Sequence, residues 1–463
     1  MVPGFLSRPR FRKLLAVLLP AAVCFSVGQC EDWLRFRGPN GSGVCLDKAP
    51  VPAEWGPTKN LKWKVAVPGA GVSCPVVVGS RVFVTCYDGY GLDRREPGEQ
   101  EDLTRSMVCF DRADGTVLWQ KTVKAVLPED PYSGMGVPEH GYASHTPVSD
   151  GKHIYAFFGK SGVFAWDLDG RELWHAPVGL ESDPRRWGSS SSPVLSGNIL
   201  IVPAGPESRA VIGFDAGTGK EIWRAESEGL GNVWGTPIEV TSDGRTDVVI
   251  GAPNEIWGLN PETGKLRWFC EAMETDQFSS SVVEADGMIY AIEGRGGGSI
   301  AVKAGGKGDV TKTHVIWSGR DSSRFGTPVV YDGRIYYFSN KVVNCMNAVT
   351  GERIFQGRLT NNIAPAASNQ PEESGGPGTG RQRTRGFGGA SDYASAIIAD
   401  GKIFYTARNG DIYVLKATDT LQQLAVNRVT NNDEEFSATP AVSDGQLFIR
   451  SSRYLYCIAA KQE

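Results

Sequence analysis

A turn sequence that returns about every 45 residues constrains the fold of this chain more than any other feature. Asp-Gly, or a related Gly-Ser or Ser-Gly pair, stands between short apolar segments at residues 79–80, 150–151, 196–197, 243–244, 286–287, 332–333, 400–401 and 444–445. From residue 150 onward, successive pairs are 46, 47, 43, 46, 68 and 44 residues apart. Asp-Gly flanked by alternating apolar residues is a strong β-hairpin signal. The sequence therefore predicts eight hairpins, one in each repeat.

Each repeat continues into a third strand, a second turn and a fourth strand that carries a Trp, as in residues 214–223 and 259–268. Four strands in about 45 residues are typical of one propeller blade. The last repeat lacks a fourth strand, whereas residues 60–65, with Trp63, form a strand pattern without preceding strands. We therefore predict an all-β fold, a single eight-bladed β-propeller of four-stranded antiparallel blades, with its ring closed by the N-terminal strand.

The first thirty residues have the pattern of a secretory signal peptide. Arg8, Arg10, Arg12 and Lys13 precede an apolar run over 14–27, which small residues follow. The run is shorter than the roughly 20 residues that a membrane-spanning helix needs. We expect a signal peptide over 1–30 and a propeller over 31–463, with insertions at 87–106 and 357–392. A retained anchor or a lipid anchor at Cys30 is the alternative to a periplasmic or secreted protein without a transmembrane span.

The charge excludes one class of partner. The chain has 48 Lys and Arg against 52 Asp and Glu, a formal net charge of −4. A nucleic-acid binder that works through bulk positive charge would need the opposite balance. Removing residues 1–30 takes away four positive charges and leaves about −8 by the same count. We therefore expect an acidic exported protein that does not bind nucleic acid.

The nine cysteines show no CxxC spacing, which gives a zinc or redox site little support. Cys74 and Cys86 flank the turn at residues 79–81, and a three-residue loop there would place them opposite each other. A disulfide between them is one interpretation, since an oxidising compartment permits it. Buried free thiols in the core are the other.

The repeat pattern, with Asp215, Thr218-Gly219 and Trp223 as one copy, resembles the pyrrolo-quinoline quinone (PQQ) repeat family. The opening segment over 32–41 and the segments 140–147 and 158–162 are similar to exported PQQ-like propeller proteins of planctomycete bacteria. The resemblance implies two kinds of relative: quinoprotein alcohol dehydrogenases, which hold PQQ and calcium, and BamB-type scaffold lipoproteins of the outer-membrane assembly machinery. The adjacent Cys-Cys pair of the dehydrogenases and any haem-attachment CxxCH are absent from this sequence.

An aromatic residue followed by small residues recurs before the innermost strands, where a propeller brings its blades to one mouth of the central channel. The candidate ligand-binding residues of this mouth are His140, Tyr142, Arg186, Trp187, Trp234, Gln277, Phe278, Arg324, Phe325, Tyr393, Glu435 and Phe436. Such a ring suits a planar ligand or a partner peptide. The alternative is that the aromatic side chains pack between blades.

The sequence indicates no catalytic residues and no metal site, because His140 and His145 lack a third ligand with suitable spacing. We expect an exported, monomeric, non-catalytic binding or scaffold protein that takes a protein partner or small ligand at the channel mouth. A PQQ-dependent dehydrogenase and a BamB-like envelope lipoprotein are the alternatives, so PQQ stays open as a cofactor.

Overall fold

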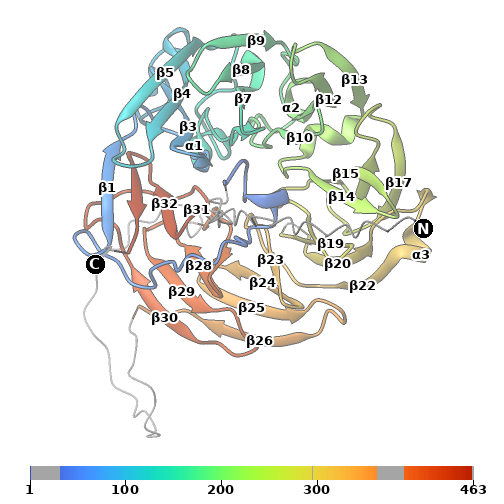
Figure 1. Ribbon diagram of the computed structural model, residues 1–463. Helices are drawn as coiled ribbons and strands as arrows, with labels where there is room; N and C mark the ends of the chain where they lie inside the picture. Colours follow the sequence, from blue (N-terminus) through green and yellow to red (C-terminus); the bar gives the residue numbers. More distant parts are fainter. Residues whose placement is uncertain (2–31, 295, 362–390, 461–463) are drawn as a thin grey trace, which may run out of the picture.

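Eight β-sheets stand around a central axis and form a closed ring (Figure 1). The computed structural model describes residue 1 and residues 32–294, 296–361 and 391–460. Each sheet has four main antiparallel strands, which lie side by side from the axis outward. The predicted eight-bladed all-β propeller is therefore confirmed.

Blades 1 to 4 follow the chain order. Blade 1 contains β2 (Val76–Val78), β3 (Arg81–Asp88), β4 (Thr104–Asp111) and β5 (Val117–Lys124). Blade 2 contains β6 (Val148–Ser149), β7 (His153–Phe157), β8 (Val163–Asp167) and β9 (Glu172–Ala176). Blade 3 contains β10 (Val194–Ser196), β11 (Ile199–Ala204), β12 (Ala210–Asp215) and β13 (Glu221–Glu226). Blade 4 contains β14 (Ile238–Ser242), β15 (Arg245–Ala252), β16 (Glu255–Leu259) and β17 (Leu266–Glu271), with the short β21 (Gly308–Asp309) parallel to β17.

Blades 5 to 8 complete the ring. Blade 5 contains β18 (Val283–Ala285), β19 (Met288–Glu293), β20 (Gly298–Lys303) and β22 (Val315–Gly319). Blade 6 contains β23 (Val329–Tyr331), β24 (Arg334–Ser339), β25 (Val342–Asn347) and β26 (Arg353–Arg358). Blade 7 contains β27 (Ile397–Ala399), β28 (Lys402–Thr406), β29 (Ile412–Lys416) and β30 (Gln423–Asn427). Blade 8 contains β31 (Ala441–Ser443), β32 (Gln446–Arg450), β33 (Tyr454–Ile458) and, as its outermost strand, β1 (Leu61–Ala66).

Short helical turns lie between the strands. They are η1 (Pro39–Gly41), η2 (Gln100–Asp102), α1 (Val137–His140), η3 (Gly159–Ser161), α2 (Gly205–Ser208), η4 (Glu228–Asn232) and α3 (Thr311–His314). No helix among the described residues is long and apolar enough to cross a membrane.

The predicted hairpin turns follow from the backbone conformation that Asp-Gly adopts. Asp243, Asp286, Asp332, Asp400 and Asp444 have φ between 49° and 54°, and the Gly after each has φ between 66° and 75°. Positive φ at both central residues is the type I′ turn, whose twist matches that of the flanking strands. The repeated dipeptide therefore fixes the innermost hairpin of these blades.

The two ends of the described chain meet in blade 8. Strand β1 pairs with β33, so that Lys64 lies opposite Tyr456 and Ala66 opposite Tyr454. An N-terminal strand thus lies on the outside of a sheet built otherwise from the last residues of the propeller (Figure 1). This pairing covers an edge of β33 that would otherwise expose its backbone groups.

In five blades the outermost strand carries a tryptophan that joins the blade to the next one. The indole Nε1–H of Trp223 donates to the carbonyl oxygen of Pro261 in the following blade, at 2.8 Å. The same contact joins Trp63 to Arg112, Trp119 to Leu168, Trp174 to Ala216 and Trp317 to Ala348, at 2.9–3.0 Å. Trp268 differs, because its indole donates to the carboxylate of Asp247 in its own blade.

The residues ahead of β1 cross the ring as an N-terminal strap, residues 32–45. Trp33 forms a bridge with Val77 in blade 1, and Val44 forms one with Ile398 in blade 7. Between them the guanidinium of Arg37 donates to the carbonyl oxygens of Thr327, Pro328 and Ala396, at 2.6–3.2 Å. The strap therefore crosses the axis, where its blue trace is visible in Figure 1.

The prediction of a three-residue turn between Cys74 and Cys86 is wrong. Val76 pairs with Phe83 and Val78 with Arg81, so the turn has two residues, not three. Continued along the hairpin, this register sets Cys74 opposite Thr85 instead of Cys86. Both cysteines are buried free thiols in the structure, which corresponds to the second interpretation.

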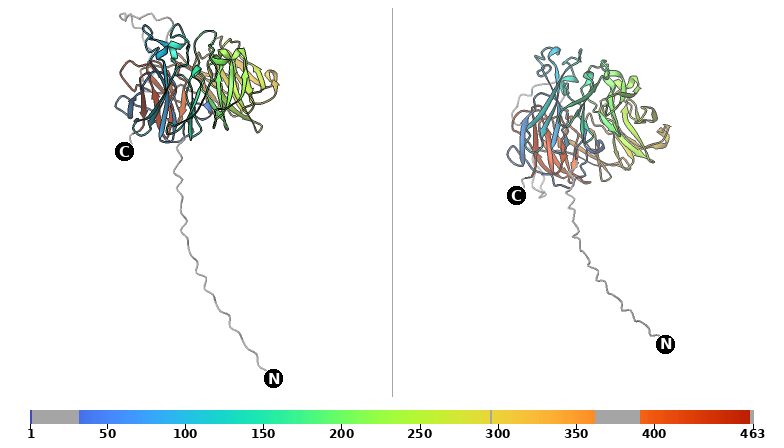
Figure 2. Two further views of the ribbon diagram at one scale, coloured as in Figure 1. Left: turned by 90° about the horizontal axis from the view of Figure 1, so that it is seen from above. Right: turned by 45° about the horizontal axis from the view of Figure 1, so that its top comes forward.

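Several expectations concern segments beyond the described residues. The signal peptide over 1–30 and most of the insertion over 357–392 lie outside them. The insertion expected at 87–106 is described, and its irregular part is confined to 89–103, because β3 extends to Asp88 and β4 begins at Thr104. In the edge-on view, the cyan part of the chain, which includes β4 and β5, extends beyond one face of the ring (Figure 2).

Candidate functional site

A ring of hydrogen bonds, the belt, surrounds the channel just before the innermost strands. The backbone N–H of Thr146 donates to the hydroxyl of Ser192 in the next blade, at 2.9 Å. The same bond recurs from blade to blade at 2.9–3.0 Å. The belt residues are Cys74, Thr146, Ser192, Thr236, Ser281, Thr327, Ser395 and Thr439. The belt divides the channel into a turn side, where the strap lies, and a loop side, where the predicted mouth lies.

Four of the predicted site residues are buried. The exposed fraction is 6% for Tyr142, 4% for Gln277, 0% for Phe278 and 1% for Phe436. The hydroxyl of Tyr142 donates to the carbonyl oxygen of Asp130, and the backbone carbonyl of Phe278 accepts a bond from Trp234. Their burial favours packing between blades for these four side chains.

Two pairs of half-exposed aromatic side chains lie on the loop side. Trp187 and Trp234, from blades 3 and 4, have ring centroids 5.5 Å apart, and the indole of Trp234 donates to the carbonyl of Gly188. Phe325 and Tyr393, from blades 6 and 7, are stacked with centroids 4.5 Å apart. The structure thus brings together aromatic residues that the sequence placed in separate repeats.

Arginines cover both aromatic pairs. The guanidinium of Arg185 lies 5.2 Å from the ring of Trp187 and pairs with Asp276 and Gln277. On the other pair, Arg324 lies 5.1 Å from Phe325 and Arg408 lies 5.6 Å from Tyr393. Stacked guanidinium and aromatic groups present flat apolar surface beside fixed positive charge. We name these two groups the aromatic–arginine pairs.

The loop that carries Trp187 is held by a buried carboxylate. Asp183 is 1% exposed and accepts bonds from the backbone N–H groups of Arg185, Trp187 and Gly188. Burial raises the pKa of this carboxyl, against those three hydrogen bonds. Arg186 at the tip of this loop is exposed and has a φ of 54°.

Helix α1 covers the mouth between the two aromatic–arginine pairs. The Nε2 atom of His140 lies 2.8 Å from the carbonyl oxygen of Trp187 in blade 3, and its Nδ1 atom lies 2.7 Å from the hydroxyl of Ser144. The carboxylate of Glu139 pairs with Arg408 of blade 7 at 2.5 Å. A helix of the segment between blades 1 and 2 is therefore tied to blades on opposite sides of the mouth.

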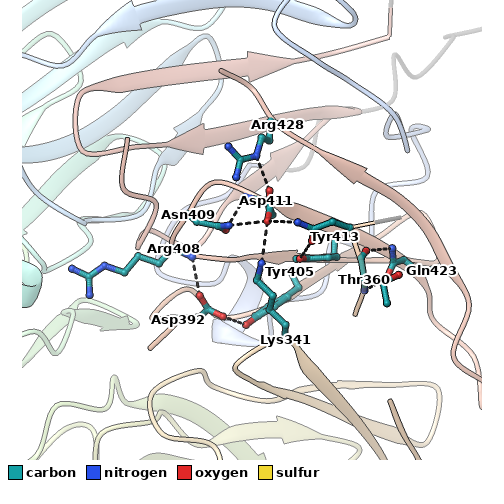
Figure 3. A network of polar contacts seen from close by, with 11 residues as sticks. Lys341, Thr360, Asp392, Tyr405, Arg408, Asn409, Asp411, Tyr413, Gln423 and Arg428 are labelled. Carbon is teal, nitrogen blue, oxygen red and sulfur yellow. Dashed lines mark hydrogen bonds and ion pairs between the residues drawn. The ribbon is translucent and has the colours of Figure 1, made fainter. Parts of the chain in front are cut away.

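A polar network in blade 7 fixes the position of Arg408 (Figure 3). The backbone N–H of Arg408 donates to Asp392, which also accepts the hydroxyl of Tyr405. Three residues after Arg408, the buried carboxylate of Asp411 accepts bonds from Arg428 at 2.6 Å and Lys341 at 3.0 Å. These cations and hydrogen bonds lower the pKa of Asp411 despite its burial. The turn between β28 and β29 is thereby anchored at both ends.

Glu435 of blade 8 is exposed and pairs with the other nitrogen of the Arg408 guanidinium, at 3.1 Å.

A buried polar cluster that sequence reasoning missed lies between blades 1 and 3. The Nε2 atom of His145 lies 2.8 Å from the hydroxyl of Ser189, which donates in turn to the carboxyl of Glu207. Arg105, 2% exposed, pairs nearby with Glu129 at 2.7 Å. Burial raises the pKa of Glu207 to about 7 and lowers that of His145 well below its ordinary value. Glu207 lies on α2, whose sequence carries no signal that would connect it to His145.

The turn side of the channel holds a cavity of about 950 Å³ between the strap and blades 2 to 5. Ser149, Leu195, Glu239 and Glu284 line it, and each follows a belt residue by three positions. Strap residues, Arg35 among them, form the opposite wall. None of the sequence-predicted site residues lies in this cavity, because all of them precede the belt.

The side chains that could bind a metal differ in their arrangement from what a calcium–quinone centre requires. Calcium takes six to eight oxygen ligands, commonly from several carboxylates. Within residues 32–294, 296–361 and 391–460, no group of three or more His, Cys, Asp or Glu side chains is placed to hold one ion. The described residues therefore do not fit the calcium part of such a centre, although the aromatic–arginine pairs suit a planar anion.

The comparison with protein families decides the relationship of this chain. The model of the family described as outer membrane protein assembly factor BamB matches residues 104–357, which is more than half of the chain. The chain belongs to this PQQ-repeat family. The predicted resemblance is confirmed by that match and by the eight blades.

Solved structures similar to this chain include a BamB protein and alcohol dehydrogenases. BamB from Moraxella catarrhalis has a TM-score of 0.55 at 13% identity, covering 86% of this chain and 97% of that one. Quinohemoprotein alcohol dehydrogenase from Comamonas testosteroni has a TM-score of 0.57 at 11% identity, covering 94% and 81%. At such identities these structures show the fold alone.

A curated relative is the polyvinylalcohol dehydrogenase of Sphingopyxis sp. (strain 113P3), 21% identical over 294 residues. The match covers 54% of this chain and 41% of that protein, so the chain spans less than half of the relative's length. The similar proteins therefore carry the names of an assembly factor and of dehydrogenases.

Proposed function

We propose that this protein is an exported, non-catalytic binding propeller that docks a partner protein on the loop side of its ring. The observation that carries the proposal is the presence of two aromatic–arginine pairs at the same mouth. Aromatic and Arg side chains dominate the energetics of protein interfaces, because they bury large area and make directional polar contacts. Both pairs are partly exposed, whereas the aromatic side chains Tyr142, Phe278 and Phe436 of other repeats are buried.

The position of α1 supports a surface site over a deep one. Glu139 and His140 tie α1 to blades 7 and 3, so a small ligand on the channel axis would have to displace these contacts. A partner that lies across the aromatic–arginine pairs needs to displace at most the contact of Glu139 with Arg408, and it leaves His140 in place on blade 3. The family is described as outer membrane protein assembly factor BamB, and an assembly factor agrees with a scaffold role.

Site-specific photo-cross-linking in the native envelope tests the proposal. A benzophenone amino acid replaces Trp234 or Phe325 on the loop side, and Ile354 on the outermost strand β26 serves as the matched control, since it is 38% exposed. We expect one cross-linked product of the same mass from positions 234 and 325 and none from 354. Equal cross-linking from all three positions would contradict a specific mouth site.

A PQQ-dependent dehydrogenase is the second candidate, favoured by the similarity to polyvinylalcohol dehydrogenase. Its test is reconstitution of the purified protein with PQQ and Ca²⁺, followed by quinone absorbance and dye reduction with alcohols as substrates. Stoichiometric binding with turnover would establish this function and overturn the first proposal. Absorbance of free PQQ with no dye reduction would leave the binding proposal in place.

Export completes the proposal. The basic and apolar pattern of residues 1–30 supports a periplasmic or secreted protein. Mass spectrometry of the mature N-terminus would distinguish cleavage at about residue 30 from acylation of Cys30, which would make the protein a lipoprotein of the BamB kind.

A further inference from the structure

Glu139 occupies a position between two arginines that come from different parts of the ring. One carboxylate oxygen pairs with Arg94 in the loop of blade 1, and the other pairs with Arg408 of blade 7. Arg408 is mostly buried, with 15% of its side chain exposed, while Arg94 is 54% exposed. The cations lower the pKa of Glu139 although the group is half-buried, so the carboxylate is charged at neutral pH.

The surroundings of Glu139 match those of a ligand carboxylate at an interface. Arg408 stacks on Tyr393, which stacks on Phe325, which carries Arg324. A carboxylate bound to Arg408 therefore lies at the edge of a continuous aromatic–arginine surface. Bidentate and charge-assisted bonds to Arg are the usual way in which proteins recognise carboxylates.

Several arginines lie around this mouth, and three of them form ion pairs with carboxylates. Arg94, Arg185, Arg186, Arg324 and Arg408 carry five positive charges there. The carboxylates that pair with them are Asp276, Glu139 and Glu435. Withdrawal of Glu139 would remove the carboxylate partner of Arg94 and leave Arg408 paired with Glu435, so that this position favours a carboxylate from a partner.

A glycine with positive φ stands at each end of the segment that carries Glu139. Gly136 has a φ of 113° and Gly141 has a φ of 71°, conformations that residues with side chains rarely adopt. Helix α1 contains only the four residues between them. Its attachment to blade 7 therefore depends on the side chain of Glu139, and not on backbone pairing.

We propose that Glu139 is an internal competitor, holding Arg408 and Arg94 in the free protein until an acidic, aromatic-containing peptide segment of a partner replaces it. This inference rests on the proposed binding function and names the chemistry of the partner. The partner's carboxylate takes the place of Glu139 on Arg408, and its aromatic side chain packs on the Phe325–Tyr393 pair. Because the free protein must release its own carboxylate first, the apparent affinity is lower than the intrinsic one.

Two synthetic peptides provide the test. The acidic probe is the acetylated, amidated pentapeptide Glu-Trp-Glu-Trp-Glu, and its neutral counterpart has Gln in place of each Glu. Dissociation constants are measured by fluorescence anisotropy for the wild-type chain, Glu139→Gln, Arg94→Gln and Arg408→Gln. Glu262→Gln, in an exposed turn of blade 4, is the matched control for a lost carboxylate.

We expect Glu139→Gln to bind the acidic peptide about fivefold more tightly than the wild type, because the variant lacks the carboxylate that competes for Arg408. Arg94→Gln should give a smaller gain, since it weakens the attachment of Glu139 and leaves Arg408 in place. Arg408→Gln should bind at least about tenfold more weakly than Glu139→Gln. The neutral peptide and Glu262→Gln should show no change.

Hydrogen exchange over residues 136–141 accompanies each binding measurement. Faster exchange in Glu139→Gln together with tighter binding supports the inference. Faster exchange with unchanged or weaker binding overturns it, and so does the absence of binding by every variant. The proposed binding function would survive either of those results if positions 234 and 325 still cross-link to a partner. The two proposals therefore fail separately.

Discussion

The guanidinium of Arg37 donates a hydrogen bond of 2.6 Å to the carbonyl oxygen of Pro328, 291 positions away in the sequence. Further bonds run to Thr327, Ala396, Gly41 and Ser42, and no part of the side chain is exposed. One residue of the strap thus satisfies carbonyl groups of blades 6 and 7, together with those of the strap itself. Burial lowers the pKa of Arg37 to about 9, so it is charged at neutral pH.

Replacing Arg37 should therefore destabilise the whole ring. Arg37→Met leaves several buried carbonyl groups without their donor, and each such group costs roughly 1–3 kcal/mol. We expect the free energy of unfolding, measured by urea denaturation, to fall by at least about 3 kcal/mol. Arg171→Met is the control, because that side chain is 78% exposed, and it should change stability by less than about 0.5 kcal/mol. Equal stability of both variants would show that the strap contributes little.

The hydrogen bonds of the belt predict that one substitution lowers the free energy of unfolding and that another does not. Thr146→Ala removes the hydroxyl that accepts the backbone N–H of Cys74, and should cost about 1–2 kcal/mol. Cys74→Ser replaces a weak sulfur acceptor with a hydroxyl of the kind found at the other seven positions, and should leave stability equal or higher. Thermal unfolding measured with and without reducing agent checks both points. A drop in stability on reduction that occurs in the wild type and is absent from Cys74→Ser would show that Cys74 forms a disulfide.

The contact between Trp223 and Gly264 predicts a strong effect for the addition of one methyl group. A Cβ atom at Gly264 would lie 2.3 Å from the indole ring of Trp223, and the φ of 68° disfavours any residue with a side chain. We expect Gly264→Ala to lower the free energy of unfolding by about 2 kcal/mol or more. Gly333→Ala, at a similar φ of 70° but with open space around it, separates the conformational cost from the steric one. Similar losses in both variants would rule out the steric contribution.

The buried carboxyl of Glu207 predicts a specific dependence of stability on pH. Its pKa is about 7 in the folded protein, against an ordinary value of 4.5, and burial is the main cause. Between these values the folded chain keeps a proton that the unfolded chain releases. Stability from this group therefore falls as the pH rises from about 4.5 to 7 and is constant above that, a loss of about 3 kcal/mol in all.

Glu207→Gln removes this titration while keeping a neutral side chain of the same shape. The free energy of unfolding of the variant, minus that of the wild type, should increase between pH 5 and pH 7.5. Urea denaturation at several pH values measures this difference, in which the contributions of other groups cancel. A difference that stays constant with pH would show that Glu207 is ionised in the folded protein.

The repeat explains why so much of the fold could be predicted. The Asp-Gly turns, the apolar strands and the tryptophans each depend on contacts within one blade or between adjacent blades, and they recur. Less of the candidate site could be predicted from the sequence. Trp187, Trp234, Phe325 and Tyr393 share their pattern with the buried Phe278 and Phe436, and no local feature distinguishes the exposed members from the buried ones. Glu139 and Glu207 carried no repeat signal at all.

The amino-acid sequence by itself determined the architecture, because turn conformation and strand periodicity are local properties that the order of residues expresses directly. Only the tertiary structure decided which positions face solvent and which long-range partners meet. Arg37 reaches Pro328, and Glu139 reaches Arg408, because closure of the ring brings together residues that lie hundreds of positions apart. Such contacts depend on the relative placement of whole blades. No local sequence pattern therefore indicates the contacts that hold α1 over the mouth.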